Sequence, residues 1–162
     1  MSGSSKGMGQ ASGKSTKRKD VAIDIATARQ MLPLVKSIVS DIVNTRVRLD
    51  RLGPEQERLE RNRRSLDWSA RDRRYSLKDE VVIVEKELAG AVNELANLGV
   101  ALVDAGSGQV AFPTRINGRP AAFSWQVGED GLTYWHYAGE DLRRPIPQDW
   151  QGGAAVRARG EP

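Results

Sequence analysis

The run LAGAVNELANLGVALVD, residues 88–104, decides the fold class because the spacing of its apolar residues changes within it. Up to Leu98, apolar residues recur at alternating steps of four and three, which is typical of a helix that packs along another helix. After Gly99 the spacing shortens to two, which is typical of β-strands. Glycine is favoured just past a helix end because it readily adopts positive φ. The change therefore predicts that helices precede a sheet.

The residues before this glycine predict a helix over residues 76–98. Ser76 with Asp79 three residues later forms a capping signature, and the four-three spacing of apolar residues follows directly. Residues 67–75, just ahead of it, lose that spacing. For this segment both a helix and a loop remain open.

An earlier helix is predicted over residues 25–52, with Asp24 as its N-cap. Pro33 removes a hydrogen bond inside this helix, so we expect a bend one turn before it. The dipeptide Gly53-Pro54 is typical of one helix ending and another beginning. It predicts a shorter helix over residues 54–66.

The residues after Gly99 predict an antiparallel β-meander over residues 100–138. Asn117-Gly118 is the strongest hairpin signal, because both residues tolerate the positive φ of a type I′ turn. The expected strands cover residues 100–104, 109–114, 120–127 and 132–138. An extended exit over residues 139–150 follows. The predicted class is α+β: a long antiparallel helical hairpin of coiled-coil character, followed by a small four-stranded antiparallel sheet with one face on the helices.

Composition predicts a single domain over residues 20–150 with a tail at each end. The first 19 residues carry five Lys and Arg and no acid, and residues 151–162 are rich in Gly and Ala, so both tails are expected to be disordered. The segment between them carries 18 Lys and Arg against 20 Asp and Glu. The net charge of +4 therefore resides in the tails and does not indicate a nucleic-acid-binding domain.

Several classes of site and location are excluded or disfavoured. The chain has no cysteine, which excludes disulfides, thiolate metal sites and cysteine nucleophiles. No stretch reaches the roughly 20 apolar residues of a membrane span, so we expect a cytoplasmic protein without membrane contact. The arginines of residues 58–74 are interleaved with acids, which favours a solvated, salt-bridged helix over a nucleic-acid surface. No cofactor and no metal are expected.

Short motifs in the second half of the chain carry a family resemblance. In order, they are Phe112-Pro113, Trp125 with Gly128-Glu129, Trp135-His136, and residues 143–146. With the helical hairpin before them, they resemble an uncharacterised bacterial family catalogued as domain of unknown function number 2203. The resemblance spans about residues 20–150 and implies no established activity. Tyr137 departs from the family pattern, which commonly has an acid there, and this weakens any metal proposal.

His136 is the only histidine and the main catalytic candidate. It could act as a general base with Glu129 as its carboxylate partner, while Arg143 and Arg144 clamp an anionic substrate, as in a small hydrolase. A lone histidine is a poor zinc site, because zinc normally takes three or four protein ligands. The alternative is a partly buried histidine beside a tryptophan, with the arginines pinning the exit segment through ion pairs.

Two tryptophans on neighbouring strands are ligand-binding candidates. Trp125 and Trp135 would form an aromatic platform if both faced solvent on one side of the sheet. The alternative is that they are the largest core residues of a small sheet. Together with His136, Arg143 and Arg144 they define the candidate binding surface.

The apolar arc of both helices is wider than one partner helix can cover. The residues that widen it are Leu34, Ile38, Val43, Val82 and Ile83. We therefore expect a non-enzymatic scaffold or interaction protein that forms a homo-oligomer, or binds a protein partner, through its helices. The alternative function is the small hydrolase. If those five side chains are covered within one chain, the argument for self-association fails.

Overall fold

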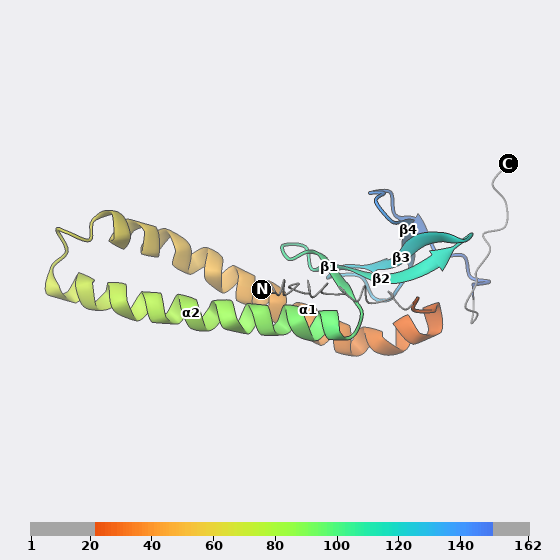
Figure 1. Ribbon diagram of the computed structural model, residues 1–162, viewed down its shortest axis with the longest axis horizontal. Helices are drawn as coiled ribbons and strands as arrows, with labels where there is room; N and C mark the ends of the chain where they lie inside the picture. Colours follow the sequence, from red (N-terminus) through yellow and green to blue (C-terminus); the bar gives the residue numbers. More distant parts are fainter. Residues whose placement is uncertain (1–21, 151–162) are drawn as a thin grey trace, which may run out of the picture.

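The computed structural model describes residues 22–150 and contains two helices followed by an antiparallel sheet (Figure 1). The helices are α1 (Ile25–Arg61) and α2 (Trp68–Asn97), and the strands are β1 (Ala101–Asp104), β2 (Gln109–Ile116), β3 (Arg119–Trp125), β4 (Tyr134–Tyr137) and β5 (Arg144–Pro145). The predicted α+β class is confirmed. The tails predicted over residues 1–19 and 151–162 lie outside the described residues.

α1 begins as predicted but is much longer than predicted. Asp24 is its N-cap, and the Asp24 carboxylate accepts a hydrogen bond from the Thr27 N–H at 2.7 Å. The helix then continues for 37 residues. The predicted end near residue 52 and the separate helix over residues 54–66 are therefore wrong.

The helix continues through Pro54, although an interior proline costs about 3 kcal/mol of helix stability. The residues just after Pro54 contact α2. Leu59 is buried, and the Glu55 carboxylate accepts hydrogen bonds from Arg73 of α2 at 2.8 and 3.0 Å. Because most helix stability in proteins comes from tertiary packing, these contacts outweigh the local signal for a break.

α2 begins at Trp68, so the segment that the sequence left open is helical. Asp67 is the N-cap and accepts a hydrogen bond from the Ala70 N–H at 2.8 Å, and the predicted start at Ser76 is wrong. Residues 67–75 lack a regular apolar spacing because this part of α2 contacts α1 through charged side chains: Arg74 lies 2.8 Å from Glu60 of α1. The first turns of α2 are therefore fixed by the cap and by charged contacts.

The five strands form one sheet in chain order, β1-β2-β3-β4-β5, with every neighbouring pair antiparallel. Asn117 and Gly118 have φ of 54° and 72° and join β2 to β3, which confirms the predicted hairpin. β5 is a fifth strand where four were predicted. It has only two residues, one of them Pro145, so it offers no alternation from which it could be predicted.

One hydrophobic core joins the sheet to the helices. The sheet contributes Val110, Phe112, Ile116, Phe123, Trp125, Trp135 and Tyr137, and α1 contributes Ile25, Ala28, Leu32, Val35, Ile38, Val39 and Ile42. All of these α1 residues lie in its N-terminal half, which passes beneath the sheet (Figure 1). Since side chains alternate along a strand, the intervening residues Ala122, Ser124, Tyr134 and His136 lie on the opposite, outer face.

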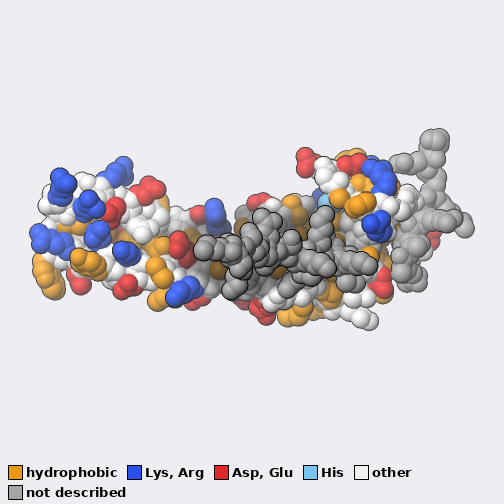
Figure 2. All heavy atoms as spheres, viewed as in Figure 1, with side chains coloured by type: hydrophobic (Ala, Val, Ile, Leu, Met, Phe, Trp, Pro, Cys, Tyr) orange, Lys and Arg blue, Asp and Glu red, His pale blue; other side chains and the backbone are white. Residues whose placement is uncertain are grey.

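Beyond the sheet, α1 and α2 continue as a two-helix arm, residues 46–84 (Figure 1). Its buried apolar residues are Leu59, Leu77, Val81 and Val84, and none belongs to the core under the sheet. Lys and Arg side chains gather around the free end of the arm (Figure 2). The sheet does not need this length for support, so the arm requires its own explanation.

Candidate functional site

Both candidate tryptophans are core residues. Trp125 is 3% exposed and Trp135 is 5% exposed. The Trp135 ring makes an edge contact with Tyr137, with ring centroids 4.9 Å apart, and lies 5.3 Å from the Trp150 ring. The Trp125 indole N–H donates to the Glu129 carbonyl oxygen at 3.0 Å. The sheet therefore does not present the two rings as an aromatic platform, and the core alternative describes them.

Arg143 and Glu129 form a largely buried ion pair over the outer face of the sheet. One guanidinium nitrogen of Arg143 lies 2.5 and 3.0 Å from the two carboxylate oxygens of Glu129, and the side chains are 21% and 16% exposed. The Arg143 Nε donates to the buried Ser124 hydroxyl at 3.0 Å. The guanidinium also lies 4.4 Å from the Tyr134 ring centroid. These contacts pin the exit segment to β3 and β4.

Arg144 is engaged elsewhere. Its guanidinium forms an ion pair with Glu140 at 3.3 Å, and it lies 5.1 Å from the ring centroids of both Trp135 and Tyr137. Arg143 and Arg144 thus contact opposite faces of the sheet, as successive residues of an extended chain do. The structure does not bring the two arginines together as a clamp for one anion.

His136 lies on the outer face without its expected carboxylate partner. Its Nδ1 is 2.9 Å from the carbonyl oxygen of Tyr137, and its backbone is paired with Ala122 of β3. Glu129 follows the far end of β3, beyond Trp125, which is three residues or about 10 Å from Ala122. Both Glu129 oxygens accept from Arg143 instead. A His136–Glu129 general-base pair is therefore not assembled.

His136 lines a pocket of about 330 Å³. Most of its lining side chains are small or apolar, among them Ala111, Pro113, Ala122 and Ala138. Arg115 also lies in this lining. Among the described residues, this lining contains no carboxylate, and Thr114 is its one hydroxyl-bearing residue.

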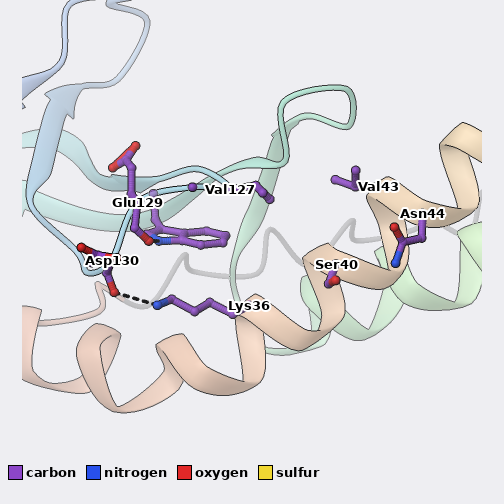
Figure 3. A pocket seen from close by; sticks show the side chains of 9 residues that line it. Lys36, Ser40, Val43, Asn44, Val127, Glu129 and Asp130 are labelled. Carbon is purple, nitrogen blue, oxygen red and sulfur yellow. Dashed lines mark hydrogen bonds between the residues drawn. The ribbon is translucent and has the colours of Figure 1, made fainter.

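A second hollow of about 390 Å³ lies between α1 and the β3–β4 loop (Figure 3). Its lining residues are Lys36, Ser40, Val43, Asn44, Trp125, Val127, Gly128, Glu129 and Asp130. The Lys36 ammonium donates to the Asp130 carbonyl oxygen at 2.7 Å and lies 5.7 Å from the Trp125 ring centroid. Lys36 therefore ties the loop to the helix, and no motif or spacing in the sequence indicates this role.

The arm carries an exposed apolar stripe along α2, formed by Trp68, Tyr75 and Val82. Their exposed fractions are 78%, 64% and 44%. A spacing of seven residues places all three on one side of the helix, and the buried residues Leu77 and Val84 lie on the other. Figure 2 shows hydrophobic side chains at intervals along the lower edge of the arm, where Figure 1 places α2.

Sequence reasoning missed the first two members of this stripe, because residues 67–75 had no clear helical period. The seven-residue spacing of Trp68, Tyr75 and Val82 was the available signal. Among the five residues that were expected to widen the apolar arc, Ile38 is buried and Val43 is partly buried. The other three remain exposed: Leu34 at 50%, Val82 at 44% and Ile83 at 57%.

The charges that face across the arm are paired within the chain. Arg73 contacts Glu55 and Glu80, while Arg74 and Arg63 both contact Glu60. Hydrogen bonds from these arginines lower the pKa of Glu55 and of Glu60 below the usual value. This is the salt-bridged helix pair that the interleaved charges predicted.

Comparison with known proteins places the chain in a family. Within residues 22–150, no helix is long and apolar enough to cross a membrane, and no group of three or more His, Asp or Glu side chains could hold a metal ion. No curated protein and no solved structure matches the chain. The family model described as "Uncharacterized conserved protein (DUF2203)" matches residues 23–146, from just before α1 to just after β5. The chain therefore belongs to this family of uncharacterised conserved proteins.

Proposed function

We propose that this protein is a non-enzymatic interaction protein that self-associates through the outer side of α2. The observation that carries the proposal is the stripe of Trp68, Tyr75 and Val82 on an arm that the sheet does not need. Aromatic residues supply much of the binding energy in protein interfaces, and large exposed apolar side chains in a row often mark such an interface. Ile83, 57% exposed, widens the stripe at one end.

A coiled-coil character of the arm supports the same proposal. Leu77, Val81 and Val84 are buried at steps of four and three residues, which is the spacing of a helix-helix seam. The pairing of α1 with α2 uses this seam. The stripe on the opposite side of α2 then offers a second seam, which a further helix can cover.

The hydrolase alternative has less support. It requires His136, a carboxylate and two arginines to converge on one substrate. Glu129 accepts from Arg143, Arg144 pairs with Glu140, and the imidazole of His136 contacts a backbone carbonyl. Each of these groups is bound to a different partner, so they do not converge on a common substrate site.

Sedimentation equilibrium across a wide range of protein concentrations tests the proposal. We expect the wild-type chain to shift from monomer to dimer as concentration rises, and Tyr75→Glu to remain monomeric, because a carboxylate at the centre of an apolar seam is costly to desolvate. Leu142→Glu is the matched control, since Leu142 is 62% exposed at the sheet end, away from the arm. A wild-type chain that is monomeric at every concentration contradicts the proposal.

A further inference from the structure

Charged residues flank the α2 stripe in a repeating order. Residues three positions after each stripe residue lie on one flank, and residues four positions after it lie on the other. The first flank carries Arg71, Lys78 and Glu85, and the second carries Asp72, Asp79 and Lys86. At each of the three levels along the helix, the two flanks therefore bear opposite charges.

These six side chains are exposed. No ion pair among residues 22–150 includes any of them, whereas the arginines that face α1 pair with its glutamates. Apart from Arg71, which follows Asp67 by four residues, none has an opposite charge three or four positions away along the helix. The Arg71 Nε also donates to the carbonyl oxygen of Leu66 at 3.0 Å, but a neutral carbonyl leaves the arginine charge unpaired. The flank charges are thus available to a group outside the chain.

The flank pattern distinguishes two ways of joining a pair of stripes. When two helices face each other in parallel, the first flank of one meets the second flank of the other. Arg71 then lies beside the partner's Asp72, Lys78 beside the partner's Asp79, and Glu85 beside the partner's Lys86. Two-fold symmetry repeats each contact on the other side of the seam.

An antiparallel arrangement brings like flanks together. With Tyr75 at the centre of the seam, Arg71 would lie beside the partner's Lys78, and Asp72 beside the partner's Asp79. Both contacts are repulsive. The charge pattern therefore selects one orientation from the two that the apolar stripe alone allows.

Resting on the proposed self-association, we infer that the partner of the α2 stripe is a second copy of this chain, bound in parallel and in register. Trp68, Tyr75 and Val82 each face the same residue of the other copy. The sheet rises on the side of the helices away from the lower edge formed by α2 (Figure 1), so the two sheets lie at the same end of the dimer without covering the seam.

Cysteine cross-linking reads the orientation directly, because the chain has no cysteine of its own. In a parallel pair Val82 faces the partner's Val82, so Val82→Cys alone is expected to form a disulfide-linked dimer under mild oxidation. In an antiparallel pair it faces the partner's Trp68, so a cross-link needs a mixture of Trp68→Cys and Val82→Cys chains. Leu142→Cys, exposed at the sheet end, measures cross-linking by random collision.

Charge reversal supplies an independent readout. Replacing Asp72 and Asp79 by Lys makes both flanks basic at those levels and is expected to raise the dimer Kd at least about tenfold, since each exposed pair alters binding by a few-fold. Adding Arg71→Asp and Lys78→Asp exchanges the two flanks and is expected to restore the Kd, because a parallel pair is again complementary. In an antiparallel pair the exchange restores nothing, since like flanks still meet.

The outcomes separate this inference from the proposed function. Cross-linking only in the Trp68→Cys and Val82→Cys mixture would overturn the parallel arrangement and leave self-association standing. A dimer by sedimentation that forms no cross-link above the Leu142→Cys level would place the interface elsewhere, and would overturn both this inference and the proposed role of α2 in self-association. A chain that is monomeric throughout would overturn the proposed function itself.

Discussion

Replacing Arg143 with Met is the sharpest test of what the candidate-site residues do. The substitution keeps the aliphatic length and removes the guanidinium, which lies 2.5 Å from Glu129 and 3.0 Å from the Ser124 hydroxyl. Ser124 is fully buried, and its hydroxyl keeps only the longer hydrogen bond from the Gln109 side chain at 3.3 Å, so losing the bond from Arg143 costs about 1 kcal/mol. Glu129 is 16% exposed and keeps an uncompensated charge, which costs about 1–3 kcal/mol after allowing for partial solvation. The expected loss of stability is about 2–4 kcal/mol.

Urea unfolding followed by tryptophan fluorescence measures this loss, because Trp125 and Trp135 are buried in the same sheet. Arg46→Met is the matched control: Arg46 is 54% exposed in its pair with Asp50, so we expect less than about 0.5 kcal/mol. Adding Glu129→Gln to Arg143→Met should recover part of the loss, since the orphaned charge disappears. A loss no larger than that of the control would refute the view that this pair holds the exit segment.

Three further predictions concern the fold. Gly108→Ala should destabilise the protein by about 1–3 kcal/mol, because a Cβ there, at φ +67°, would collide with Val127 and other side chains. Gly118→Ala, at φ +72° with open space around it, should cost only the backbone strain, and urea unfolding of both variants checks this. Asp67→Ala should lower stability by about 1 kcal/mol through loss of the α2 cap, whereas Ser76→Ala, inside the helix, should not lower it. Equal losses of stability in the two variants would contradict a start of α2 at Trp68. The pKa of Glu55 is lowered in the folded chain, so its stabilising contribution is complete above the pKa of the unfolded chain and disappears as pH falls through the folded pKa. Thermal melts between neutral pH and about pH 3 should show this loss of stability, and Glu55→Gln should reduce it.

Local sequence signals determined much of the architecture. Asp24 caps α1, Gly99 follows α2 with φ +80°, and Asn117-Gly118 makes the tight turn between β2 and β3. Each depends on residues within a few positions of one another. The change of apolar spacing near Gly99 likewise depends only on which faces of a helix or a strand can be buried. These features could be predicted because the physics that sets them is local.

The candidate site was predictable only in part. From sequence, the arginines were expected either to clamp an anion or to pin the exit segment through ion pairs, with Glu129, Glu140 and Asp141 all open as partners. The tryptophans were likewise expected either to bind a ligand or to lie in the core. The choice required knowledge of which face of the sheet meets α1. It also required the register that brings Arg143 over Ser124 and places His136 three residues along β3 from Trp125.

The order of helices and strands, the α1 cap, the tight hairpin and the apolar faces follow from the sequence alone, because periodicity and backbone preference act within short segments. Three further features emerge only in the folded chain: α1 continues through Pro54, Trp125 and Trp135 are buried, and the stripe beginning at Trp68 faces away from α1. The physical reason is that these outcomes depend on contacts between residues far apart in the chain. Such contacts can outweigh a local preference, and their partners are set by packing and register.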